Sequence, residues 1–247
     1  MSNTLITSLP WDSSHFGLRI ARALPRRLDL PTYSQLEAAC IDQGIDCLYF
    51  LADAADQATI AILQAGRFDF VDIRLTLENS ACRLVNMLTK GEFRFRFGKA
   101  SDLEALLPIA GESYTMSRFY SDQRFDRDKA SLMYQIWLKN SLAADYADAV
   151  VVAEMAGQPV GYVTCHLQKP PGEANLGLVG VAESARGMGC TSEMLHYAGR
   201  WLSEREFDRV NVVTQGKNIP AQRAYQRCGF VTRSVELWFH KWFQHTD

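Results

Sequence analysis

The stretch from Leu176 to Leu202 constrains the fold of this 247-residue chain more than any other. It begins with the apolar run Leu176–Val181, passes through a turn that contains Gly187 and Gly189, and continues as a segment with apolar residues at helical spacing. The residues that share this spacing are Met194, Leu195, Ala198, Trp201 and Leu202. A glycine turn at a helix N-terminus points several backbone N–H groups outward, and with the helix dipole these favour a phosphate or pyrophosphate.

Three phosphate-binding motifs compete for this turn. A dinucleotide fingerprint needs a third glycine, where Ser192 stands, and its acidic partner would be Asp208, which precedes the next strand instead of ending it. A P-loop needs Gly-Lys-Ser/Thr after its first glycine, and the turn contains no such run. The third pattern is Arg-x-x-Gly-x-Gly/Ala, which Arg186 and Gly189 match, with Thr191 at the last small position. An ordinary connection without a ligand is the fourth interpretation.

A second run, Asn218–Phe230, follows the next expected strand, Arg209–Thr214. It reads Asn-x-x-Ala-x-x-x-Tyr-x-x-x-Gly-Phe, and Pro220 suits the first turn of a short helix that ends before Gly229. Together and in this order, the turn and this run resemble the acetyl-CoA loop and the terminal motif of the GNAT N-acetyltransferases.

The resemblance covers about residues 92–243 and implies the fold. We expect an α/β (α+β) protein in which residues 92–247 form a GNAT domain with a mixed, splayed central sheet and paired strands at its end. Residues 1–88 alternate predicted strands and helices. They are expected to form a smaller N-terminal α/β domain that resembles an incomplete GNAT unit.

The resemblance also assigns a co-substrate, acetyl-CoA, and no metal. The residues expected to bind it are Val179, Val181, Arg186, Gly187, Met188, Gly189, Cys190, Thr191, Asn218 and Ala221. Tyr225 would protonate the departing thiolate, because a phenol with a pKa near 10 keeps its proton at neutral pH. Asn218 fits a helix-terminal turn equally well. Three residues remain open as the base that deprotonates the amine: Glu112, Glu183 and His166.

Two further segments resemble a subgroup, the TDP-fucosamine acetyltransferases of bacterial surface-polysaccharide pathways. They are Trp11-Asp12-Ser13-x-x-Phe16-Gly17 and Ser117-Arg118-Phe119. The likeness implies direct transfer of acetyl, in a ternary complex, to the amine of a dTDP- or UDP-linked amino sugar. Arg118 and Tyr120 would bind that acceptor. The alternatives are a GNAT enzyme for a peptide, antibiotic or other small amine, and a non-catalytic acyl-CoA-binding module.

Composition narrows the partners and the compartment. The net charge of −2 gives no electrostatic reason to bind nucleic acid or an anionic membrane. The six cysteines form no C-x-x-C pair, and no histidine pair has zinc spacing. With no signal peptide pattern and no long apolar run, these features predict a reduced, cytoplasmic protein. The resemblance adds a homodimer, formed through terminal strands, as an option.

Overall fold

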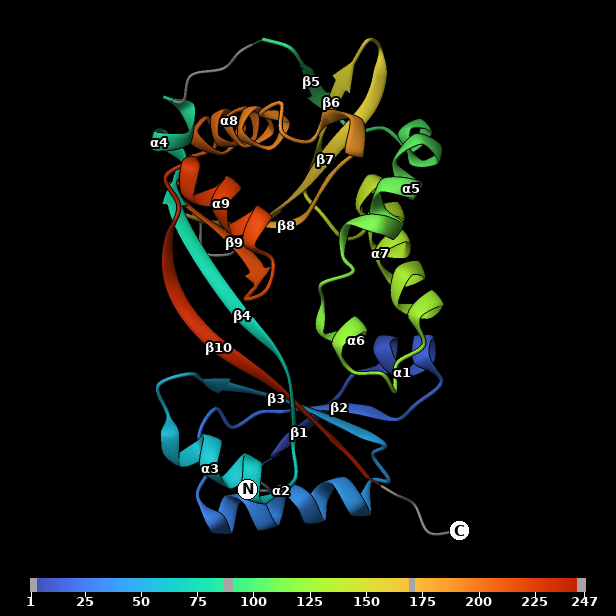
Figure 1. Cartoon of the computed structure of the whole chain (residues 1–247), viewed down its shortest axis with the longest axis vertical. Coiled ribbons are helices and arrows are strands. Elements are labelled where there is room, and N and C mark those ends of the chain that lie inside the picture. Colours follow the sequence, from blue (N-terminus) through green and yellow to red (C-terminus); the bar gives the residue numbers. More distant parts are fainter. Residues whose placement is uncertain (1–3, 87–90, 169–171, 244–247) are drawn as a thin grey trace. The chain divides into compact units, whose positions relative to one another are not determined.

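The structure is a computed structural model that describes residues 4–86, 91–168 and 172–243. These residues form two compact units that interleave along the chain (Figure 1). Unit 1 comprises residues 1–74, 117–129 and 235–247, and unit 2 comprises residues 75–116 and 130–234. The predicted domain boundary at residue 88 lies outside the described residues, so the division into residues 1–88 and 92–247 stays a prediction.

Unit 1 is built on a small mixed sheet. Strand β1 pairs antiparallel with β2, β2 pairs parallel with β3, and β3 pairs antiparallel with β10. The strands are β1 (Ile6–Ser8), β2 (Ile20–Ala23), β3 (Cys47–Asp53) and β10 (Val231–Trp242). The helices of this unit are α1 (Pro10–Phe16), α2 (Leu30–Asp42), α3 (Gln57–Ala65) and α6 (Arg118–Ser121).

Strand alternation gives the sheet of unit 1 two different faces. Leu48, Phe50 and Phe239 belong to the hydrophobic core that α2 and α3 cover (Figure 1). Tyr49 and His240 point to the opposite face, because successive side chains of a strand alternate. The sequence pattern predicted paired strands after residue 230, and this is wrong: Val231–Trp242 is one continuous strand.

Unit 2 contains a larger mixed sheet with the strand order β4-β9-β8-β7-β6-β5. The neighbours from β5 to β8 are antiparallel, whereas β8 and β9 are parallel. The strands are β4 (Asp69–Ser80), of which residues 75–80 belong to this unit, β5 (Arg94–Phe97), β6 (Ala149–Met155), β7 (Gln158–Leu167), β8 (Glu173–Val181) and β9 (Arg209–Gln215). The helices are α4 (Ala81–Val85), α5 (Leu103–Ser113), α7 (Arg127–Leu142), α8 (Cys190–Ser203) and α9 (Ile219–Arg227), with short 3₁₀ turns at Ala100–Asp102 and Glu183–Ala185.

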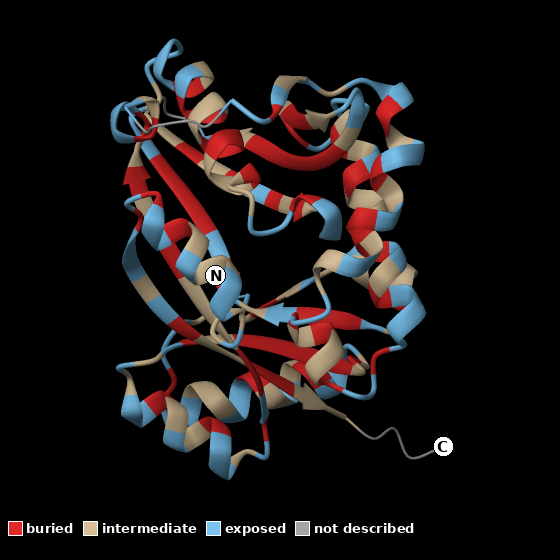
Figure 2. Cartoon of the chain, turned by 45° about the horizontal axis from the view of Figure 1, so that its top comes forward, coloured by how far each residue is buried: buried red, intermediate tan, exposed pale blue. Residues whose placement is uncertain are grey.

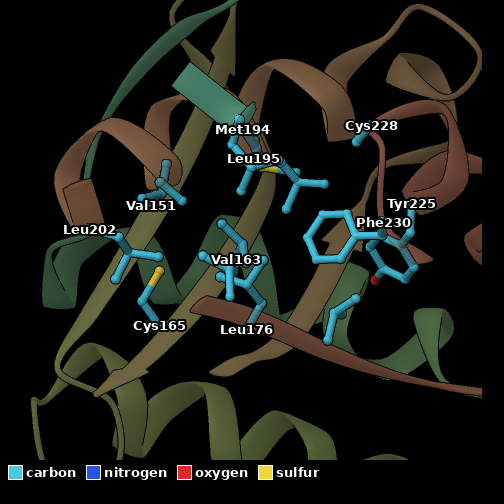
Figure 3. Packing of buried hydrophobic residues seen from close by; sticks show 14 of the residues in the cluster. Val151, Val163, Cys165, Leu176, Met194, Leu195, Leu202, Tyr225, Cys228 and Phe230 are labelled. Atoms are coloured by element: carbon cyan, nitrogen blue, oxygen red, sulfur yellow. The ribbon is translucent and has the colours of Figure 1, made fainter. Parts of the chain in front are cut away.

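Helix α8 supplies the central layer of the unit 2 core. Its residues Met194, Leu195 and Leu202 are fully buried, as the helical spacing predicted, and they pack with Val163 and Leu176 of the sheet (Figure 3). Most residues of this helix are buried or partly buried, and Arg200 and Ser203 near its C-terminal end are exposed. Buried residues likewise gather in the interior of the chain in Figure 2.

The sheet of unit 2 opens between β8 and β9. Their parallel pairing runs from Glu173 opposite Arg209 to Leu176 opposite Val212, although both strands continue further. On its other side, β8 carries an irregularity at which the buried Thr164 hydroxyl accepts a hydrogen bond from the Leu178 N–H at 2.8 Å. The predicted mixed α/β fold with a splayed sheet is confirmed. Among the described helices, none has the length and apolar character needed to cross a membrane.

Candidate active site

A pocket of about 780 Å³ lies in unit 2 beside the open edge of β8. It is lined by the end of α5, the end of β8, the turn that leads into α8, and helix α9. Three arginines, Arg186, Arg223 and Arg227, line it together with a single carboxylate, Glu112. The pocket therefore favours an anionic ligand.

The turn before α8 has the backbone geometry that the sequence predicted. Gly187 and Gly189 have φ angles of 77° and 95°, which favour glycine. Gly189 is the N-cap of α8, and the first bond of the helix runs from the Glu193 N–H to the Gly189 carbonyl. The N–H groups of the first helical residues have no partner within the helix. Donors in this arrangement, beside Arg186, fit a pyrophosphate.

The pocket brings together nearly all the residues predicted to bind acetyl-CoA. Each of them lines it except Met188, which packs against the hydrophobic core of unit 2. Asn218 also performs the alternative role considered for it: its Oδ1 accepts a hydrogen bond from the Ala221 N–H at 3.2 Å and caps α9. Arg186 donates from Nε to the Val181 carbonyl at 3.2 Å. A carbonyl has two acceptor sites, so this bond leaves one for a ligand.

Tyr225 lines the pocket from the middle of α9 and is held by the rest of its motif. Gly229, with φ of 84°, turns the chain so that the Phe230 N–H bonds to the Tyr225 carbonyl at 3.1 Å. The two rings lie together, with centroids 5.8 Å apart (Figure 3). Burial, and then the neighbouring Cys228, raise the pKa of Tyr225. The phenol therefore remains protonated at neutral pH and can act as a proton donor.

The three candidate bases have different positions. Glu112 lines the pocket, whereas Glu183 and His166 are not among its lining residues. His166 contacts the Thr164 hydroxyl at 3.0 Å beside the β8 irregularity, and burial lowers its pKa. Cys190 is buried at the start of α8, where burial and then Glu193 raise the pKa of its thiol to about 12, so it packs as a neutral side chain.

Several lining residues escaped the sequence analysis. They are Ser113, Thr115, Met116, Ala185, Ser192, Pro220, Arg223, Ala224 and Arg227. A usable signal existed for the two arginines: they are four residues apart on α9 and therefore share one helical face. Among the described residues, no group of three or more His, Cys, Asp or Glu side chains could hold a metal ion.

Arg118 and Tyr120, predicted to bind the acceptor, lie on α6 in unit 1 and do not line this pocket. Arg118 instead lies over three aromatic rings of unit 1. Phe16 and Phe119, from the two segments that resemble the subgroup, stack with centroids 5.4 Å apart. The fold of unit 1 thus joins two motifs that are about a hundred residues apart in the chain.

Residues 109–230 match the model of the acetyltransferase (GNAT) family. They form an acetyltransferase domain of the GNAT family. The predicted GNAT domain is thus confirmed for residues 109–230.

Two curated relatives have names that refer to polysaccharide biosynthesis or to a nucleotide-linked sugar. The spore coat polysaccharide biosynthesis protein SpsD of Bacillus subtilis (strain 168) is 29% identical over 144 residues, which are 57% of this chain and 48% of that protein. The dTDP-fucosamine acetyltransferase of Escherichia coli O6:H1 is 23% identical over 142 residues, 57% of this chain and 60% of that protein. These matches span about half the length of the relatives. A solved GCN5-related N-acetyltransferase from Kribbella flavida has the same fold, with a TM-score of 0.65, 15% identity and coverage of 98% of this chain and 88% of that one.

The turn before α8 can be tested with a pair of matched glycines. We expect Gly187→Ala to weaken acetyl-CoA binding roughly tenfold, because a side chain at positive φ drives the turn out of the conformation that aligns its N–H groups. Gly157→Ala is the control: Gly157 has φ of 80° against 77° for Gly187, and at both positions an added Cβ meets no described atom within 4 Å. Calorimetric titration with acetyl-CoA separates the variants. Equal affinities would show that the turn does not hold the phosphates.

Proposed function

We propose that this protein transfers acetyl from acetyl-CoA to the amine of a nucleotide-linked (dTDP or UDP) amino sugar, by direct transfer in a ternary complex. The observation that carries the chemistry is the pocket of unit 2. There a protonated, buried phenol, Tyr225, lines the same space as the glycine turn before α8. The sugar acceptor is supported by the relatives named for polysaccharide biosynthesis and for dTDP-fucosamine.

In the proposed reaction, residues of unit 2 hold the co-substrate and move one proton. The backbone of Val179 and Val181 lies at the open edge of β8, where a pantetheine arm can pair as an extra strand. The amine nitrogen attacks the acetyl carbon, so a C–N bond forms as the C–S bond breaks. Tyr225 gives its proton to the sulfur. The proton lost by nitrogen leaves through water or a base, and Glu112 is the carboxylate among the lining residues.

The acceptor is assigned to two residues of α6 in unit 1, Arg118 and Tyr120. A guanidinium suits a diphosphate because it offers a fork of donors and stays charged. This chemistry supports Arg118 as a residue that binds the diphosphate of the acceptor.

The experiment is a turnover assay with acetyl-CoA and a panel of amines: dTDP- and UDP-amino sugars, an antibiotic amine, a peptide N-terminus and a polyamine. We expect kcat/KM to be highest for a nucleotide amino sugar. If another amine were acetylated efficiently and no nucleotide amino sugar were acetylated, the proposed acetyl transfer would stand and the proposed acceptor would be wrong. Binding of acetyl-CoA without transfer to any amine would favour the non-catalytic acyl-CoA-binding module.

A further inference from the structure

Unit 1 holds one guanidinium in an unusual environment. The Cζ atom of Arg118 lies 4.6 Å from the ring centroid of Tyr49, 4.2 Å from that of Phe119 and 4.5 Å from that of Trp238. Tyr49 belongs to β3 and Trp238 to β10, on the sheet face opposite the α2–α3 core. Three rings fix the position of the cation, but they leave its charge unneutralised.

Carboxylates that could neutralise Arg118 are engaged elsewhere or lie too far away. Asp122 accepts hydrogen bonds from His240 at 2.8 Å, Trp242 at 2.9 Å and Arg124 at 3.0 Å. Burial raises the pKa of Asp12, and the positive charge of Arg118 lowers it by a smaller amount. Among the described residues, no carboxylate oxygen comes within 4.0 Å of the Arg118 guanidinium.

The same cluster contains buried polar atoms without a partner. They are Nε of Arg118, Oγ of Ser117 and Oη of Tyr49. The Tyr49 hydroxyl is close enough to the Arg118 side chain to accept from it, which leaves the O–H of Tyr49 as a donor. Tyr49 is 0% exposed and Ser117 is 4% exposed, so the surrounding protein shields both hydroxyls from bulk water. Ser117 occupies the N-cap position of α6, but its hydroxyl makes no capping bond. Buried polar groups are normally paired, and unpaired ones in a native fold call for a ligand or a water.

We infer that Arg118, Ser117 and Tyr49 form an oxyanion site in unit 1 for a phosphate of a nucleoside diphosphate. All three unpartnered groups can donate hydrogen bonds, and a phosphate oxygen accepts several at once. Arg118 as a residue is only half-buried, although its Nε is buried. The identity of the ligand rests on the proposed acceptor class, whereas the site itself rests on the cluster. Tyr49 and Trp238, which are far from α6 in sequence, would thus join the predicted Arg118 as acceptor residues.

The test is calorimetric titration of the full chain, saturated with CoA, with dTDP, UDP, thymidine and inorganic phosphate. We expect dTDP or UDP to bind, thymidine to bind far more weakly, and Arg118→Met to weaken the diphosphate roughly tenfold or more. The control is Arg124→Met, which removes a guanidinium of the same unit that also lies over a ring, Trp242 at 4.9 Å, but is already paired with Asp122 and Asp69. It should change the diphosphate affinity by less than about twofold.

Ser117→Ala provides a second variant in case Arg118→Met does not fold. It removes an unpartnered hydroxyl and no capping bond, so we expect a normal fold and a diphosphate affinity reduced severalfold. Equal affinity for dTDP in the wild type, Arg118→Met and Ser117→Ala, or no binding to the wild type, overturns the site. Phosphate that binds as tightly as dTDP overturns the nucleotide as its ligand.

The inference and the proposed function can fail separately. If diphosphate binding depends on Arg118 but no nucleotide amino sugar is acetylated, the site is supported and the proposed acceptor is wrong. Acetylation of a nucleotide amino sugar with the same acceptor KM in Arg118→Met keeps the function and removes the site.

Discussion

Tyr225→Phe should lower kcat by about 10² or more while leaving the dissociation constant of acetyl-CoA nearly unchanged. The substitution removes one oxygen from a ring that is 5% exposed and packs against Phe230, so the core of unit 2 is kept. What it removes is the proton for the departing thiolate. Steady-state turnover and calorimetric binding of acetyl-CoA measure the two quantities separately.

The matched control for this experiment is Tyr197→Phe. Tyr197 is a partly buried tyrosine of α8 that packs against Phe95 and Phe97, and it does not line the pocket. We expect this variant to retain wild-type kcat within about twofold. If Tyr225→Phe turned over acetyl-CoA as fast as Tyr197→Phe, the phenol would have no part in the reaction.

Local sequence motifs predicted the glycine turn and the short helix that line the pocket of unit 2. The turn at Gly187 and Gly189 and the run from Asn218 to Phe230 each act over a few residues, through positive φ angles, a cap and a helix end. These features depend on residues that are close together in the sequence. The spacing of the motif residues was therefore enough to place Tyr225 in the correct helix. Met188 was the exception among the residues predicted to line the pocket. The order of residues in a turn does not show which side chain packs against the core.

The aromatic cluster around Arg118 in unit 1 depends on contacts that no local sequence pattern shows. Arg118 meets Tyr49 and Trp238 because two strands, far apart in the sequence, pair antiparallel and present the same face. Tyr49 lies in a run of apolar residues, Cys47–Leu51, that predicted a buried strand without showing which residues face which side. The interleaving of the two units escaped prediction for the same reason, since residues 117–129 and the end of β10 join unit 1 through contacts that are distant in the sequence.

A second large effect should appear in the stability of unit 1 as the pH falls. His240 is fully buried, and its Nδ1–H donates to Asp122, while Nε2 has no partner. Burial lowers the pKa of His240 to about 4, and the bond to Asp122 offsets only part of that shift. Arg118 and Arg124 also disfavour the protonated ring. Protonation at Nε2 would bury a charged donor without an acceptor.

The direction of the pH effect follows from proton binding in the two states. With an unfolded pKa near 6.5 and a folded pKa near 4, the unfolded chain binds the proton first, so this contribution is complete above about pH 6.5 and is lost as the pH falls towards 4. We expect the free energy of unfolding of the wild type to fall by roughly 2 kcal/mol more between pH 7.5 and pH 5 than that of His240→Asn. The asparagine can still donate to Asp122 but cannot take up a proton in this range. Urea unfolding of both proteins at the two pH values measures this difference. The contributions of His166 and of the carboxylates to the pH dependence cancel, because both proteins contain these groups. Equal losses in the two proteins would mean that His240 does not set the acid sensitivity of unit 1.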